Sequence, residues 1–374
     1  RKKHILENML YMCDISAKNI FILDQIFNPE QKYNLKRHKG SFLENGFDKK
    51  MREWNIEKFD IAVGNPPYQE NNVNGGTQPK NHNLWSKFIF KVFELFKNDS
   101  ILLFVTPDSW RSPSSKVLKL FKDNNLEYAN FDVAKYFPGV GSTFSYFLVK
   151  KGKTKSKFKL YDLELDINNI HYIPNGGKES MLIHLKTIMS NNEKFNILCD
   201  TTSNHSSSKK KNLSKTLTNS NIYKVFHTNA QTFYSTQKSN NHDDYKVLFT
   251  ISGYFNPFYD KGEISTSEIC LYILVNDDIQ GNNLLSILNS KLYKFLINTG
   301  KWSGFLNKDI IRSLPKLDVN QEWTDEKLYQ HFNLTQEEID LIEGKTTNNN
   351  STSDDDIQMY EVETKNSGGT ETTY

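Results

Sequence analysis

The sequence has no apolar run of membrane-spanning length, and its first residues, RKKHILENML, lack the features of a secretory signal. It also has only three cysteines, Cys13, Cys199 and Cys270, whose spacing fits neither a metal site nor a disulfide framework. These absences argue against an integral membrane protein, a disulfide-rich secreted domain and a zinc module. They predict a cytoplasmic protein without a bound metal, in a reducing compartment.

Positive charge is in small excess, with a formal net charge of +3, but the charged residues are unevenly distributed along the chain. Residues 343–374 contain seven acids and two bases in a low-complexity stretch, which we expect to be a disordered acidic tail. The rest of the chain is therefore basic. A basic body suits a nucleic-acid partner, although many soluble proteins have similar basic faces.

Apolar runs of strand length alternate with segments of helical periodicity through the first 152 residues. FDIAVGN (59–65) and SILLFVTPDSW (100–110) are predicted to be buried strands, and LWSKFIFKVFELFK (84–97) is predicted to be the helix between them. Continuous apolar strands are typical of a parallel sheet covered on both faces. The pattern therefore predicts a doubly wound α/β domain over residues 1–152.

The composition changes after residue 152, where Asn, Ser and Lys become frequent and the candidate strands become shorter. NLLSILNSKLYKFLINTG (283–300) is predicted to be one amphipathic helix that ends at Gly300. We therefore expect a second α+β domain over residues 153–342.

The tetrapeptide Asn65-Pro66-Pro67-Tyr68 directly follows the first predicted strand. Two prolines remove two backbone donors and restrict the preceding residues to extended conformations. Such a stiff segment presents its carbonyl oxygens to another molecule, and ligands of open α/β sheets bind at the carboxyl ends of strands. A rigid structural turn is the plainer alternative.

These residues resemble the catalytic motif of amino-methyltransferases that use S-adenosylmethionine, above all those that methylate N6 of adenine in DNA. YMCDIS, GSFLE, LFVTPDSWRS and TFSYFLVKK resemble further motifs of that family, so the resemblance covers roughly residues 5–152. It implies the methyltransferase fold, N-terminally incomplete, followed by a C-terminal target-recognition domain, as in type II and type IIG restriction–modification enzymes.

The resemblance also implies roles for individual residues. Catalysis would fall to Asn65, Pro66, Pro67 and Tyr68. Residues expected at the cofactor are Asp14 and Ile15 on the ribose side, Ser41, where the family often has Asp, and Phe42 on the adenine side, and Asn65. Tyr68 and Phe144 would line the target-base pocket, with Phe137 and Phe147 as competitors for the place of Phe144. For Asp14 a helix cap or a solvated acid is the alternative, and for Phe144 plain core packing.

The family's first motif, a strand with a glycine-rich loop that holds the methionine part of the cofactor, has no counterpart before Asp14. Thirteen residues precede Asp14, and none is a glycine. We therefore expect a segment N-terminal to Arg1, or a companion chain, to complete the cofactor site. FPGVG (137–141) matches the F-x-G-x-G pattern of a cofactor loop, but it precedes a strand and is predicted to be a turn. ETK (363–365) resembles a nuclease motif, but it lies in the low-complexity tail.

Double-stranded DNA is the expected partner, with no membrane contact. Candidate DNA contacts are Lys209, Lys210, Lys211, Lys301, Trp302, Lys308 and Arg312, although each base is as easily explained as a solvated side chain. The sequence leaves two alternatives open. One is a methyltransferase that acts on protein glutamine or on guanine of ribosomal RNA, and the other is a DNA-specificity module without activity of its own.

Overall fold

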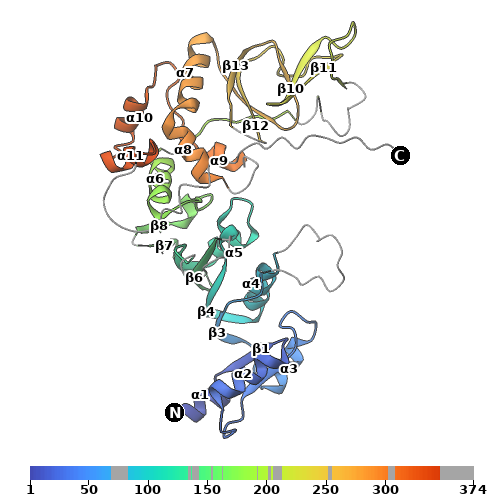
Figure 1. The fold of residues 1–374 in the computed structure, drawn as a ribbon, viewed down its shortest axis with the longest axis vertical. Helices are drawn as coiled ribbons and strands as arrows, with labels where there is room; N and C mark the ends of the chain where they lie inside the picture. Colours follow the sequence, from blue (N-terminus) through green and yellow to red (C-terminus); the bar gives the residue numbers. More distant parts are fainter. Residues whose placement is uncertain are drawn as a thin grey trace, which may run out of the picture.

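The structure is a computed structural model of the chain. It describes residues 1–68, 83–133, 136, 143–152, 155–161, 163–191, 193–200, 204, 213–251, 255–301 and 308–345. Figure 1 shows three parts along the long axis, with the N-terminal elements at one end, a large sheet in the middle and the second half at the other end. Several predicted features lie outside the described residues, namely Phe137 and FPGVG, Lys209 to Lys211, Trp302 and the acidic tail.

A small lobe begins the chain and is built around two short parallel strands. Its elements are α1 (Lys2–Asn8), β1 (Tyr11–Asp14), α2 (Ala17–Phe27), β2 (Lys36–Lys39) and α3 (Phe47–Glu53). β1 pairs with β2 in parallel, so their carboxyl ends lie together, and the backbone N–H of Gly40 donates to the carbonyl of Asp14. Tyr11 contacts Phe59 with ring centroids 5.7 Å apart, which places β1 beside the start of the next strand.

The central part is a six-stranded mixed sheet in the order β3-β4-β6-β5-β7-β8. Its elements are β3 (Phe59–Gly64), α4 (Leu84–Leu95), β4 (Phe96–Pro107), the 3-10 turn η1 (Asp108–Arg111), α5 (Lys116–Lys122), β5 (Asn125–Asn130), β6 (Phe144–Lys150), β7 (Lys157–Leu160) and β8 (Leu163–Asp166). β3 and β4 are parallel, whereas β6 is antiparallel to both of its neighbours. The predicted α/β architecture is therefore confirmed.

The expectation that the sheet is covered on both faces is wrong for the described part of the chain. One face is buried: Leu102 and Phe147, for example, are 0% exposed beneath α4 and α5. On the other face Ile61 is 61% exposed and Val63 is 70% exposed. Cross-strand register adds half-buried Ile101, Leu103, Val105, Tyr146 and Leu148 to this uncovered face. An apolar sheet face is thus open to solvent beside β3, which is an edge strand.

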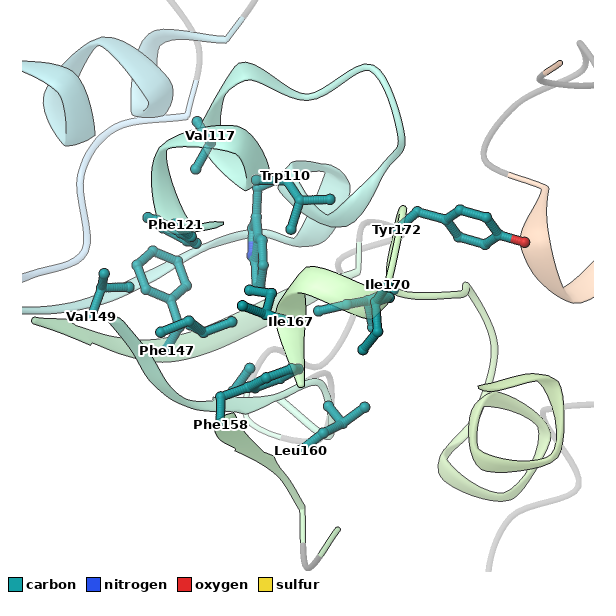
Figure 2. Close-up of a cluster of buried hydrophobic side chains, with 14 of the residues drawn as sticks. Trp110, Val117, Phe121, Phe147, Val149, Phe158, Leu160, Ile167, Ile170 and Tyr172 are labelled. Carbon is teal, nitrogen blue, oxygen red and sulfur yellow. The ribbon is translucent and has the colours of Figure 1, made fainter. Parts of the chain in front are cut away.

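The first hydrophobic core extends well past residue 152. β7 and β8 belong to the same sheet, and Ile170, Ile173 and the helix α6 (Lys178–Met189) pack into the same core. Figure 2 shows that core around Trp110, Phe121 and Phe147, with Tyr172 pointing away from the other labelled side chains. The second core begins at Phe195, so the division between the two cores lies near residue 190.

The second half contains two small sheets and a group of helices. The strands are β9 (Leu213–Ser214), β10 (Tyr223–Thr228), β11 (Gln231–Ser235), β12 (Tyr245–Thr250), β13 (Phe258–Lys261), β14 (Ser265–Thr266) and β15 (Cys270–Leu274). The helices are α7 (Asp278–Asn289), α8 (Lys291–Gly300), α9 (Lys308–Ser313), α10 (Asp325–His331) and α11 (Gln336–Ile342). One sheet has the order β14-β10-β11-β9 and the other β13-β12-β15. This mixture agrees with the predicted α+β class.

The single helix predicted over residues 283–300 is in fact two helices that meet at Ser290. The Ser290 side chain accepts a hydrogen bond from the backbone N–H of Tyr293, which caps α8 and ends α7 at Asn289. A serine can satisfy an unpaired backbone donor at a helix start. The apolar periodicity continues across the break because both helices pack on the same core, and this explains the error.

Among the described residues, no helix is both long and apolar enough to cross a membrane. A search of the same residues finds no group of three or more His, Cys, Asp or Glu side chains that is arranged to hold a metal ion.

Candidate functional site

The Asn65–Tyr68 loop begins where β3 ends, at the carboxyl edge of the parallel β3–β4 pair. Asn65 and Pro67 are exposed, Pro66 is buried and Tyr68 is half-buried. Within the described part of the chain, no group donates a hydrogen bond to the Pro66 carbonyl oxygen. The loop therefore presents an amide side chain and a backbone acceptor side by side on a stiff segment.

The Tyr68 hydroxyl donates a hydrogen bond of 2.5 Å to Oδ1 of Asn65. Burial raises the pKa of Tyr68, so the phenol stays protonated at neutral pH and remains a donor. The Asn65 oxygen is thus already engaged by its own loop. A substrate amine must displace the Tyr68 hydroxyl, or share the oxygen through its second lone pair.

Phe144, the first residue of β6, packs against Tyr68. The ring centroids are 5.1 Å apart and the rings are tilted by 36°. Phe144 is 3% exposed, so it supports the half-buried Tyr68 from within the protein. Phe147, which the sequence left as an alternative to Phe144 in the target-base pocket, is 0% exposed and belongs to the core on the covered face of the sheet.

An open apolar hollow of about 330 Å³ adjoins Asn65 on the uncovered face of the sheet. Its lining residues are Val63, Gly64, Asn65, Leu103, Phe104, Val105 and Tyr146. A hydrogen bond with Tyr128 and burial raise the pKa of Tyr146 to about 12, so this phenol too is neutral. Tyr146 was missed at the sequence level because its position depends on cross-strand register.

The candidate cofactor residues lie at the carboxyl ends of β1 and β2. The Asp14 carboxylate accepts hydrogen bonds from the backbone N–H of Ser16 at 2.7 Å and from Asn19 at 3.0 Å. The N-cap of α2 is Ser16, so Asp14 does not cap the helix itself but holds Ser16 and Asn19, and each of its carboxylate oxygens keeps a lone pair for a further donor. Ile15 is 69% exposed beside it.

Ser41 and Phe42 differ in their availability to a ligand. The Ser41 hydroxyl accepts a hydrogen bond from the backbone N–H of Leu43 at 3.2 Å. The Phe42 ring lies between Phe47, at 4.9 Å, and Phe88 of α4, at 5.7 Å. Phe42 thus joins the N-terminal lobe to the central sheet and remains half-buried.

These residues fit part of S-adenosylmethionine. A spare carboxylate lone pair and an exposed isoleucine suit a ribose diol and an adenine ring, and the apolar hollow lies against Asn65. The methionine end needs backbone N–H groups and charge, and the described residues contain no glycine-rich loop next to β1 that would supply them.

Of the candidate DNA contacts that the structure describes, Lys308 and Arg312 both lie on α9. Burial raises the pKa of Cys199, and the positive charges of Lys308 and Arg312 act in the opposite direction, which places both bases near that thiol. Lys301 is half-buried at the end of α8, where its carbonyl oxygen accepts a hydrogen bond from Asn175. All three bases therefore lie on or directly after α8 and α9, two helices that contact each other.

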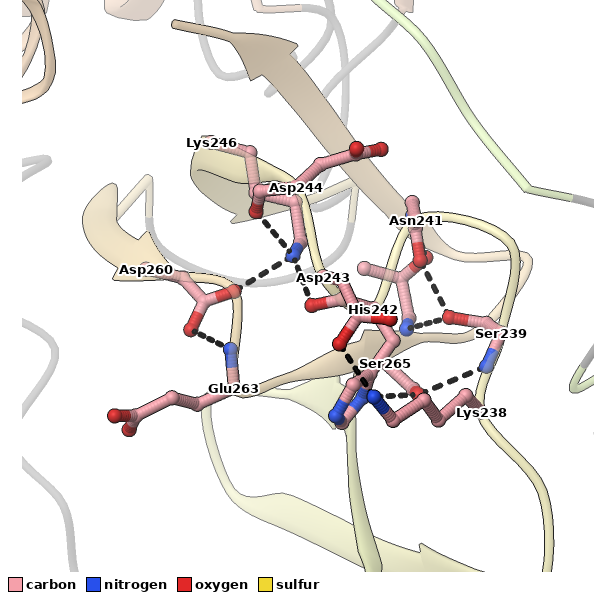
Figure 3. Close-up of polar contacts among 11 residues, drawn as sticks. Lys238, Ser239, Asn241, His242, Asp243, Asp244, Lys246, Asp260, Glu263 and Ser265 are labelled. Atoms are coloured by element: carbon pink, nitrogen blue, oxygen red, sulfur yellow. Dashed lines mark hydrogen bonds and ion pairs between the residues drawn. The ribbon is translucent and has the colours of Figure 1, made fainter. Parts of the chain in front are cut away.

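A buried polar cluster fixes the strands of the second half (Figure 3). The Lys246 ammonium is 0% exposed and donates to the Asp260 carboxylate at 2.6 Å and to the Asp244 carbonyl oxygen at 2.9 Å. Nearby, Ser239 donates to Asn241, and Asn241 donates to Thr266. The cluster ties β12 to β13 and holds the loop that leads into β12.

Replacing Lys246 with methionine should reduce the free energy of unfolding by about 3–5 kcal/mol, because Asp260 would remain charged and buried without its partner. Urea unfolding followed by circular dichroism measures the change. Lys157→Met is the matched control: Lys157 forms an exposed pair with Glu164, and its loss should leave the midpoint of urea unfolding nearly unchanged. Equal effects of the two changes would contradict the assignment.

Replacing Tyr68 separates its ring from its hydroxyl. Tyr68→Phe keeps the aromatic face and frees the Asn65 oxygen, so we expect methyl-transfer activity close to that of the parent protein. Tyr68→Ala removes the stacking surface, worth about 1–3 kcal/mol for a base, and should reduce kcat/KM by roughly 5- to 150-fold. Steady-state methylation assays compare the two, and an equal loss in both would show that the hydroxyl is the essential group.

Residues 3–144 match the model of a family described as Eco57I restriction-modification methylase. This confirms the resemblance inferred from the sequence motifs and places Asn65–Tyr68 and Phe144 within the matched region. A comparison with curated protein sequences finds no match.

Solved structures give a weaker likeness. The type IIG restriction endonuclease BpuSI has 11% identity and a TM-score of 0.33, covering 89% of this chain and 59% of that one. A methyltransferase subunit of a type I restriction–modification system from Streptococcus thermophilus has 14% identity and a TM-score of 0.31, covering 40% of this chain and 35% of that one. The EcoKI M protein has 14% identity and a TM-score of 0.29, covering 40% and 32%. The chain thus spans between about one third and three fifths of the length of these proteins.

Proposed function

We propose that the chain is the catalytic and DNA-reading part of a site-specific DNA methyltransferase of a restriction–modification system. It transfers a methyl group from S-adenosylmethionine to N6 of an adenine flipped out of the duplex. The observation that carries this proposal is the Asn65–Tyr68 loop at the carboxyl end of β3, with Phe144 supporting Tyr68, in a region that matches restriction–modification methylases.

The exocyclic amine of adenine is a weak nucleophile because its lone pair is delocalised into the ring. The Asn65 side-chain oxygen and the Pro66 carbonyl accept its two N–H bonds, which favours a tetrahedral nitrogen and makes the lone pair available. The two prolines hold these acceptors in place before the reaction, so little reorganisation is needed in the transition state. Tyr68, backed by Phe144, provides the face on which the flipped base stacks.

When bound, S-adenosylmethionine supplies a methyl group on a positively charged sulfur. Asp14 and Ile15 would hold its ribose side, and Ser41 and Phe42 would lie near its adenine. Direct transfer to nitrogen requires no covalent enzyme intermediate, which agrees with the buried, raised-pKa state of Cys270 and the raised pKa of Cys13.

A further segment, from the same polypeptide or from a companion chain, completes the cofactor site. It brings the glycine-rich loop and covers the open face that Ile61 and Val63 expose. Among the described residues no strand pairs with the outer edge of β3, and β1 lies close to the start of β3. Burying these side chains would contribute roughly 25 cal/mol per Å² of apolar surface, so the uncovered face supports such a segment.

The second half reads the DNA sequence through the grooves, while the bases near the junction of α8 and α9 contact phosphates. Lys301, Lys308 and Arg312 are the described candidates, and Lys209 to Lys211 and Trp302 remain candidates from the sequence.

Nucleoside analysis of the modified DNA tests the proposal. The chain, supplied with its cofactor-loop segment, is incubated with DNA and S-adenosylmethionine, and the digested nucleosides are separated by mass spectrometry. We expect N6-methyladenine. N4-methylcytosine alone would overturn the choice of adenine, since the related cytosine enzymes mostly carry Ser where this chain has Asn65. No methylated nucleoside, although the cofactor-loop segment is supplied, would favour a specificity module without activity.

A further inference from the structure

Arg111 lies at the junction of the two halves and is 2% exposed. It ends η1, the turn that directly follows β4, and its guanidinium lies 4.0 Å from the centroid of the Phe131 ring. The planar guanidinium has five N–H donors in a fixed arrangement, so it can hold several acceptors in one geometry. A charge buried this deeply is costly unless such partners surround it.

On one side Arg111 holds the wall of the target-base pocket. It donates to Oδ2 of Asp108 at 2.6 Å, and Asp108 is 4% exposed. Oδ1 of Asp108 accepts a hydrogen bond from the Thr143 hydroxyl at 2.7 Å, and the Asp108 backbone N–H donates to the Thr143 carbonyl oxygen. Thr143 immediately precedes Phe144, so this carboxylate fixes the start of β6 beneath Tyr68.

On the other side Arg111 holds a strap formed by residues 170–176. The guanidinium donates to the Pro174 carbonyl oxygen at 2.8 Å and to Oδ1 of Asn175 at 3.1 Å. The Arg111 carbonyl oxygen accepts a hydrogen bond from the Ile173 N–H at 3.0 Å. Ile173 itself is buried in the first core.

The strap in turn is bonded to the second half. The Asn175 N–H donates to the Thr299 carbonyl oxygen at 2.7 Å, and the Asn175 side chain donates to the Lys301 carbonyl oxygen at 3.3 Å. The Tyr172 hydroxyl lies 2.7 Å from Nε2 of His184 and 2.8 Å from the Ser313 hydroxyl at the end of α9. These contacts reach the ends of α8 and α9, where the described candidate DNA contacts gather.

We propose that Arg111 is a positioning residue that sets the register between the DNA-reading half and the target-base pocket. This inference rests on the proposed function. The Arg111 guanidinium is bonded through Asp108 to the start of β6, which bears Phe144. It is also bonded to the strap, which contacts the end of α8 and the end of α9. Because the second half grips DNA at a distance from Asn65, a small change in this register misplaces the flipped base, and misplacement by about 1 Å can cost about 100-fold in rate.

Arg111→Lys tests the proposal, because lysine keeps the charge opposite Asp108 but has a single nitrogen, whereas one guanidinium nitrogen binds Pro174 and another binds Asp108 and Asn175. Asn175→Ala is the second variant. Asn175 is only half-buried, so loss of its side chain loosens the strap with little risk to folding. Arg52→Lys is the matched control, since Arg52 forms an exposed pair with Asp48 on α3.

Both variants should lower kcat on duplex DNA at least about tenfold, with the DNA dissociation constant within about threefold of the parent. They should also lower the ratio of methylation at the recognition sequence to methylation at sites with one altered base pair. A residue that merely stabilised the fold would reduce both rates in proportion and leave that ratio unchanged. An unchanged ratio and kcat in Arg111→Lys and Asn175→Ala would overturn the inference.

Hydrogen–deuterium exchange provides a readout that does not depend on activity. In Arg111→Lys the amides of Ile173 and Asn175 should exchange faster than in the parent, together with those at Thr143 and Phe144, while amides of α5 remain unchanged. Equal protection in the parent and the variant would overturn the inference even if the protein transferred no methyl group. An inactive parent and inactive Arg52→Lys would instead count against the proposed function.

Discussion

Replacing Asn65 with alanine should abolish methyl transfer and leave DNA affinity nearly unchanged. Asn65 is exposed directly after β3, and its proposed role is to polarise the amine that attacks the methyl group. Removal of one preorganised polar group from a catalytic site typically costs about 100- to 1,000-fold in kcat. The duplex is held by other residues, so the gel-shift midpoint should hardly move.

The experiment measures labelled methyl incorporation and gel shift on the same preparations. Asn34→Ala is the control, because Asn34 is exposed in the N-terminal lobe, away from the catalytic loop. Asn65→Ala also removes the acceptor of the Tyr68 hydroxyl, and Tyr68→Phe reports that loss alone. If Asn65→Ala retains activity within about tenfold of the parent, a barrier change below about 1.4 kcal/mol, the role assigned to Asn65 is wrong.

Exchanging the second half for that of a relative should change the recognition sequence and leave the methylated atom the same. The catalytic loop contacts one extruded base and receives no information about its neighbours. Flanking base pairs are read at groove edges by side chains outside that pocket. The exchange should begin near residue 190, between the two cores, and should retain Ile310, which packs in the first core.

Sequencing of methylated sites before and after the exchange measures the outcome. As a control, deleting residues 346–374 should leave both the recognition sequence and the methylated atom unchanged, since the acidic tail has little basic surface for DNA. An unchanged recognition sequence after the exchange would mean that the first half, or another chain, determines specificity.

Individual strands and helices of the first half could be predicted from the sequence because apolar runs and helix caps involve residues that are close together in the chain. The apolar run of β3 is continuous, and α5 is capped by Ser115, whose hydroxyl accepts hydrogen bonds from the backbone N–H groups of Val117 and Leu118. The loop at Asn65 followed from its place after a strand and from its two prolines. The pairing of Phe144 with Tyr68 was predicted through a family resemblance, and the structure brings the two rings together.

Features that depend on distant contacts could not be predicted in this way. Composition does not show whether a helix covers Ile61 and Val63, because an apolar strand looks the same with one covered face or two. The role of Arg111 depends on Pro174 and Asn175, more than sixty residues away. The only local signal was a pair of opposite charges, Asp108 and Arg111, directly after an apolar strand.

Identifying the molecule that receives the methyl group decides whether the chain is a DNA methyltransferase. The chain with its cofactor-loop segment is incubated with S-adenosylmethionine that carries a labelled methyl group, in parallel with duplex DNA, ribosomal RNA and a protein mixture, and with Asn65→Ala as the blank. We expect label in DNA alone, and no label with Asn65→Ala. Label in RNA guanine or in protein glutamine, with DNA unlabelled, would contradict this expectation.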